Sequence, residues 1–284
     1  MLEMIKNMKI VPFGKIIRAR VIAIPPEHGA WVFLFSPLLI GLFLGGFSRG
    51  SLPLIMLILA AFMIRQPITI LVKILSGRRN KNDLHPALVW VVIYTLILIV
   101  SFIALILEGY YYITFLAVPA LPVFALHLWL VSKRNERRQK WVEILASGVL
   151  ALTAPAAYWV GKGAYLPMGW LIWTLSWLQA AGTILYAYLR LQQRQLKENP
   201  GPQVLQRMAR EAFLYNGLLF VGILILAAVG WIPKLLPLPY LIQPLEVIWG
   251  TSHPAISTSP KAIGIRQLIV STIFTLLFIV GWLV

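Results

Sequence analysis

The side chains best suited to chemistry are a few charged groups inside or beside long apolar stretches. Arg65 lies about half-way along the stretch 53–75, close to Pro67. A charge at that depth of a bilayer is costly and usually faces the interior of a helical bundle. We therefore predict that Arg65 points inward and pairs with Glu143, whose carboxylate fits the fork of a guanidinium. Such a pair either locks two helices together or forms an anion site.

Further polar side chains are expected on the same side of the membrane as Glu143. Glu27 and His28 begin the first apolar stretch, and a later stretch carries a row of polar residues, namely Gln179, Tyr186, Tyr188 and Arg190. Of these, Glu27, His28, Tyr188 and Arg190 are candidates for ligand binding, together with Arg65 and Glu143. Glu143 also has a structural explanation, because the helix dipole stabilises a carboxylate in the first turn of a helix.

Several kinds of chemistry are missing from the chain. It has nine Asp and Glu residues, of which Asp83 is the one aspartate, so no turn has an Asp-rich motif for Mg²⁺ and a diphosphate. It has no cysteine, and its four histidines are scattered. Neither a glycine-rich phosphate loop nor a Gly-x-Ser-x-Gly motif occurs. We therefore expect no metal site and no cofactor.

The composition is that of a membrane protein. Hydrophobic residues make up 60% of the 284 residues and charged residues 12%, against about 25% charged in a soluble domain. The apolar runs are continuous rather than alternating, which favours helices over a barrel. Five basic residues are interspersed among the apolar residues of segment 1–24. This pattern predicts an amphipathic cytoplasmic segment that lies on anionic lipid headgroups, or else an arm that binds a partner. Residues 25–284 are predicted to form a single transmembrane helical domain.

About nine transmembrane helices are expected, the eighth of which is broken by prolines and could be irregular or re-entrant. Their approximate ranges are 29–46, 53–75, 85–107, 111–131, 141–160, 166–190, 211–231, 235–249 and 263–284. With these spans, 20 of the 25 Lys and Arg residues fall on one side and 3 on the other. Basic residues gather on the cytoplasmic side, so the N-terminus is predicted inside and the C-terminus outside an inner or plasma membrane. The net charge of +16 thus needs no nucleic acid to explain it.

Several short motifs resemble the YwiC-like family of bacterial membrane proteins. They are PPEHGAW at 25–31, RQP at 65–67, NERRQKWVE at 135–143 and, more loosely, YLR at 188–190. The resemblance adds Asn135 and Arg137 to the candidate ligand-binding residues, beside the side chains named above. It implies no particular activity.

A wider resemblance concerns the UbiA-type intramembrane prenyltransferases. The number of spans, the cytoplasmic N-terminus, PLLIGL at 37–42, Lys133–Arg134 and Pro155 are similar. In that family, Asp motifs in the loops after the second and sixth helices hold Mg²⁺ and a diphosphate. The corresponding loops here are basic and contain only Asp83, so the resemblance implies the scaffold without the metal-dependent chemistry.

Three functions remain open from the sequence. The first is a scaffold that binds a lipid, an isoprenoid or a quinone, or that serves as an accessory subunit of a membrane complex. The second is a metal-independent lipid or prenyl transferase in which Arg and Lys stabilise a leaving phosphate. The third is a small-solute transporter, suggested by prolines that could interrupt helices near the midplane.

Overall fold

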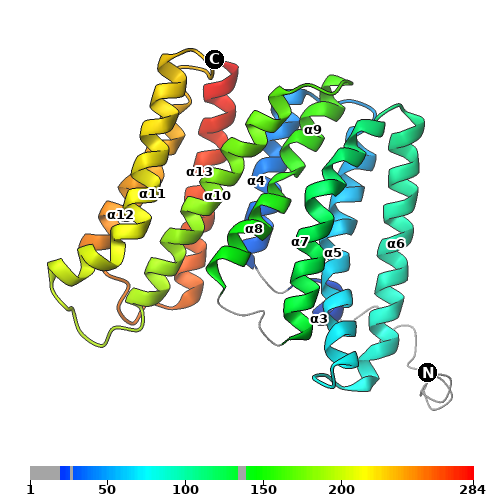
Figure 1. Cartoon of the computed structure of the whole chain (residues 1–284), viewed down its shortest axis with the longest axis horizontal. Helices are drawn as coiled ribbons and strands as arrows, with labels where there is room; N and C mark the ends of the chain where they lie inside the picture. Colours follow the sequence, from blue (N-terminus) through cyan, green and yellow to red (C-terminus); the bar gives the residue numbers. More distant parts are fainter. Residues whose placement is uncertain (1–19, 26–27, 134–138) are drawn as a thin grey trace. The chain divides into compact units, whose positions relative to one another are not determined.

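The computed structural model describes residues 20–25, 28–133 and 139–284, and every regular element in this part of the chain is helical (Figure 1). The prediction of an all-α polytopic bundle is confirmed. Each predicted span coincides with helical structure, although the fifth consists of two helices. The described residues form two compact units, which are treated separately below. A single transmembrane domain stays a prediction, and most of the basic segment 1–24 lies outside the described residues.

Unit 1 comprises Met1–Glu27 and Arg49–Arg138. Its described helices are α3 (Arg20–Ala23), α5 (Ser51–Leu75), η1 (Lys81–Asp83), α6 (Leu84–Leu107), η2 (Tyr111–Leu116) and α7 (Ala117–Ser132). α5 and α6 form a long hairpin. Gly77 adopts a left-handed conformation with φ 68° at the end of α5, where a side chain would be strained. The Nε atom of Arg79 then lies 2.6 Å from a carboxylate oxygen of Asp83, which stabilises the connection.

The short helix α3 packs against both helices of this hairpin. The Tyr94 hydroxyl donates to the Ala23 carbonyl at 3.0 Å, and the Gln66 amide donates to the Val21 carbonyl at 3.0 Å. Ile22 is buried against Ile70 and Ile74. The end of the predicted basic segment is therefore part of unit 1.

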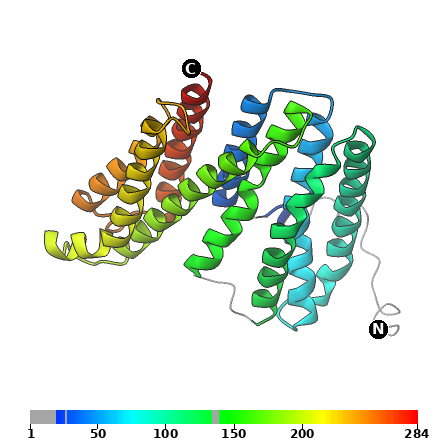
Figure 2. The ribbon, with the colours of Figure 1, turned by 45° about the horizontal axis from the view of Figure 1, so that its top comes forward.

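Unit 2 comprises His28–Ser48 and Gln139–Val284. Its helices are α4 (His28–Gly45), α8 (Lys140–Ala151), α9 (Thr153–Lys162), α10 (Met168–Gln193), α11 (Pro202–Ala228), α12 (Pro237–Ser252) and α13 (Pro260–Leu283) (Figures 1 and 2). Proline stands at the first position of three of them, where its missing N–H costs no helical hydrogen bond.

Prolines account for two differences between the observed helices and the predicted spans. The fifth span divides into α8 and α9 at Leu152, because the Pro155 ring displaces the carbonyl of Ala151 from α-helical geometry. The eighth span is a regular helix, α12, rather than an irregular segment. Pro237 and Pro239 lie in its first turn, where no backbone donor is needed, and only Pro244 interrupts its interior.

Among the described residues, six helical segments are long and apolar enough to cross a membrane. They are Ser51–Leu75, Lys81–Leu107, Tyr111–Ser132, Lys140–Lys162, Pro202–Ala228 and Pro260–Leu283. α4 is apolar but shorter, α12 has 16 residues, and α10 is long but less apolar. The chain is therefore a multi-pass membrane protein, and the number of nine spans stays a prediction.

The charges of unit 2 are strongly asymmetric. Helices α8, α11 and α13 start at one end of unit 2, and helices α10 and α12 finish there (Figure 1). We call this the basic end. Eight of the ten Lys and Arg residues of unit 2 lie on this side, and Lys162 and Lys234 lie toward the other. This pattern fits the predicted alternation of the loops between the two sides of the membrane. The assignment of the basic end to the cytoplasm stays a prediction.

Candidate functional site

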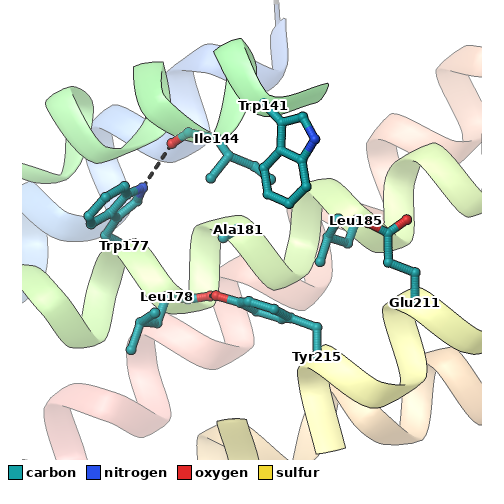
Figure 3. Close-up of a pocket in the computed structure, with 8 residues that line it drawn as sticks. All are labelled: Trp141, Ile144, Trp177, Leu178, Ala181, Leu185, Glu211 and Tyr215. Carbon is teal, nitrogen blue, oxygen red and sulfur yellow. Dashed lines mark hydrogen bonds between the residues drawn. The ribbon is translucent and has the colours of Figure 1, made fainter. Parts of the chain in front are cut away.

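A groove in unit 2 lies between α8, α10 and α11. Its volume is about 290 Å³, close to the lower limit of ordinary ligand pockets. Figure 3 shows α10 along its floor, with one wall from α8 and the other from α11. We call this the tail groove; its lining residues are Trp141, Ile144, Trp177, Leu178, Ala181, Leu185, Glu211 and Tyr215.

The aromatic side chains of the tail groove are held by hydrogen bonds to backbone carbonyls. The Trp177 indole N–H donates to the Ile144 carbonyl at 2.8 Å, and the Tyr215 hydroxyl donates to the Leu178 carbonyl at 3.0 Å (Figure 3). Trp177 also stacks on Trp173, with 5.0 Å between the ring centroids. Because the polar atoms of Trp177 and Tyr215 are already paired, these rings offer mainly apolar surface to the groove.

Charged side chains lie at one end of the tail groove. Lys140 Nζ, at the start of α8, lies 2.5 and 2.6 Å from the two carboxylate oxygens of Glu211 on α11. The Lys140 ammonium also lies 5.4 Å from the centroid of the Trp141 ring. The groove thus combines an apolar interior with a charged mouth at the basic end. This arrangement suits a molecule with an apolar tail and a polar head.

Two of the predicted site residues lie together beside this mouth. The Tyr188 hydroxyl on α10 donates to the Glu143 carboxylate on α8 at 2.7 Å. Tyr188 is one turn along α10 from Leu185, and Glu143 precedes Ile144 in the chain. The contact therefore helps to fix α8 against α10 next to the tail groove.

Arg190, another predicted site residue, is only 6% exposed and bonds mainly to backbone. One guanidinium nitrogen donates to the carbonyls of Gly250 at 2.8 Å and His253 at 2.7 Å. These carbonyls belong to the end of α12, where helical donors are lacking. The same nitrogen bonds the Gln193 side chain at 2.8 Å. In the structure, Arg190 thus joins α10 to the end of α12.

An ion pair joins α12 and α13 near the same end. The Arg266 guanidinium binds both carboxylate oxygens of Glu246 at 2.8 Å and lies 3.4 Å from the centroid of the Trp249 ring. The Tyr186 hydroxyl contacts Glu246 at 3.3 Å. The sequence analysis did not identify this pair.

Arg65 is half-buried in α5 of unit 1, with its guanidinium 5.4 Å from the centroid of the Phe62 ring. Glu143 belongs to unit 2, so the pairing of the two residues stays a prediction. Glu27, Asn135 and Arg137 lie outside the described residues. His28 begins α4 as expected, and its side chain also lies outside what the structure describes.

Sequence reasoning did not select most residues of the tail groove. The spacing of Leu178, Ala181 and Leu185 places them on one face of α10, but ordinary core residues have the same spacing. Their common cavity depends on where α8 and α11 cross α10.

Residues 24–158 match the family of YwiC-like proteins. The predicted YwiC-like resemblance is confirmed. The uncharacterized protein YwiC of Bacillus subtilis (strain 168) is 26% identical over 175 residues, which cover 60% of this chain and 68% of the relative. The matched family region includes the α8 wall of the tail groove, whereas α10 and α11 lie beyond it. No solved structure matches the chain, and the UbiA-type resemblance stays a prediction.

Proposed function

We propose that this membrane protein binds a lipid-like amphiphile, with its apolar tail in the tail groove and its polar head at Lys140 and Glu211. The supporting observation is the groove itself, an apolar space of about 290 Å³ with a charged pair at one end. A membrane lipid, an isoprenoid and a quinone share this chemistry of tail and head. The binding protein would belong to the cytoplasmic or inner membrane, with the mouth of the groove on its cytoplasmic side.

The physical reason is the cost of an empty apolar space. Side chains around a void lose their dispersion contacts, and the wide aromatic walls of the groove make this loss large. Water is a poor substitute, since the walls offer few polar partners. An apolar chain restores these contacts, and the Lys140 ammonium and Glu211 carboxylate remain available to a polar head at the water interface.

The binding is tested by filling the groove. Ala181 lies on the floor of the groove and is 4% exposed, so the ring of an Ala181→Phe variant would occupy the space. Ala228→Phe, at the exposed end of α11, is the matched control. Native mass spectrometry of protein purified in mild detergent should show a bound adduct with the wild type and with Ala228→Phe, and a loss of at least about tenfold in its occupancy with Ala181→Phe.

The mass of the adduct then distinguishes a phospholipid, an isoprenoid and a quinone. Circular dichroism of the same samples should show helical Ala181→Phe protein, so that the loss reflects the groove and not unfolding. A wild-type protein without any adduct, or an adduct that persists in folded Ala181→Phe, would refute the proposal.

A further inference from the structure

A second and much smaller cavity lies on the other side of α10, between α4 and α13. Its volume is about 20 Å³, enough for one water-sized particle. None of its lining residues belongs to the tail groove. We call it the polar cavity, because five of its lining residues carry hydroxyl or amide groups: Ser36, Ser176, Gln179, Thr183 and Ser271.

Two of these side chains have buried polar atoms without a partner. Ser176 and Gln179 are each 5% exposed, and neither the Ser176 hydroxyl nor the side-chain oxygen (Oε1) of Gln179 makes a hydrogen bond within the described part of the chain. An unpaired buried polar group costs about 1–3 kcal/mol. Two such groups at one cavity indicate that a particle occupies it.

Two hydroxyl groups at the polar cavity already use their hydrogens elsewhere. The Thr275 hydroxyl donates to the Ser271 carbonyl at 2.7 Å, so its single hydrogen is not available to the Ser36 oxygen 2.5 Å away. Ser36 must therefore be the donor in that pair. In the same way, the Thr183 hydroxyl donates to the backbone carbonyl of Gln179, one turn earlier in the same helix, at 3.1 Å. The Ser36 and Thr183 oxygens thus retain only lone pairs for a ligand.

Proline adds another acceptor at this point. Pro37 in α4 has no N–H, so the Phe33 carbonyl one turn earlier loses its α-helical donor. Both Phe33 and Pro37 line the polar cavity. Backbone carbonyls freed in this way are the groups that coordinate monovalent cations in membrane transporters.

We infer that the polar cavity binds one alkali-metal cation. A water molecule donates only two hydrogen bonds, whereas a cation interacts with every oxygen lone pair directed at it. The lining residues include no carboxylate, and sites for divalent cations generally rely on carboxylates. Neutral carbonyl, amide and hydroxyl oxygens therefore suit sodium or potassium. This site is separate from the tail groove and does not depend on the proposed function.

Two further buried amides lie on α12 and α13, outside the lining of the polar cavity. Gln267 lies one turn before Ser271 on α13 and directly after Arg266, and Gln243 lies one turn before Glu246 on α12. Gln243 is fully buried and Gln267 is 9% exposed, and the side-chain oxygen and nitrogen of both lack partners within the described residues.

The test uses the full-length protein in detergent, in sodium, potassium or choline chloride of equal ionic strength. Sodium or potassium should raise the melting temperature above its value in choline, which is too large for the cavity. Gln179→Leu should raise the cation concentration that gives half of this effect at least about tenfold. Ser147→Ala is the control, because the Ser147 hydroxyl bonds the Ile144 carbonyl at 2.8 Å, outside the cavity.

Equilibrium binding of radioactive sodium provides a second measurement that does not depend on a melting transition. The wild type and Ser147→Ala should bind sodium, with competition by unlabelled sodium, and Gln179→Leu should lose this binding. Equal melting temperatures in all three salts without sodium binding would mean that the cavity holds water, and would overturn the inference. Sodium binding that persists unchanged in a folded Ser176→Ala/Gln179→Leu double variant would overturn it as well.

Discussion

Gly41 offers the sharpest test of how unit 2 is assembled, because the backbones of α4 and α9 lie very close together there. A Cβ atom at Gly41 would lie 2.8 Å from the Ala157 Cβ and 3.0 Å from the Ala154 carbonyl carbon, and closer still to the Ala154 oxygen. One turn further, a Cβ at Gly45 would lie 2.8 Å from the Tyr158 Cα. Most of these atoms are backbone atoms that cannot rotate away. Small residues at such spacing allow close contact between helices in membranes.

Gly41→Val should therefore force α4 away from α9. Overpacking of a close interface costs about 1–3 kcal/mol, and the rigid backbone opposite Gly41 places this change at the upper end, near 3 kcal/mol. The helix propensity of valine exceeds that of glycine by only a few tenths of a kcal/mol and offsets little of this cost. The free energy of unfolding in mixed detergent–SDS micelles, followed by circular dichroism, measures the change.

Gly217→Val on α11 is the matched control. No heavy atom lies within 4 Å of a Cβ built at Gly217, so the change in unfolding free energy should stay within about 0.5 kcal/mol. If Gly41→Val unfolded at the same SDS fraction as Gly217→Val, the close contact between α4 and α9 would be refuted.

Two further predictions concern ion pairs. Arg266→Met should destabilise the protein by about 1–3 kcal/mol, because the largely buried Glu246 carboxylate loses its cationic partner. The double variant Arg266→Met/Glu246→Gln should recover most of this loss. A double variant as unstable as Arg266→Met in thermal melting would contradict the prediction. If Arg65 pairs with Glu143, the changes in unfolding free energy caused by Arg65→Met and by Glu143→Gln should differ in sum from the change in the double variant by at least about 0.5 kcal/mol. Additive changes would refute that pairing.

The sequence by itself determined the helices and their alternation. Apolar length is a local property, so the predicted ranges fall on helices from α4 to α13 with ends displaced by only a few residues, apart from the earlier start of α11. The distribution of Lys and Arg likewise predicted which helix ends lie together in unit 2. Pro155 was noted in the fifth span, but whether a proline kinks a membrane helix or divides it depends on how its neighbours accommodate the freed carbonyl.

The tertiary structure decided which polar groups meet. Tyr188 and Glu143 were both selected from the sequence, but their contact arises from the crossing of α8 and α10. Lys140 and Glu211 are 71 residues apart in the sequence, and they form the mouth of the tail groove because α8 and α11 both lie against α10. The expectation of no metal site rested on cysteine, histidine and carboxylate spacing, which carries no information about neutral oxygens. Hydroxyl and amide side chains are common on helices, and only the approach of α4, α10 and α13 leaves the Ser176 hydroxyl and the Gln179 Oε1 atom buried without partners among the described residues.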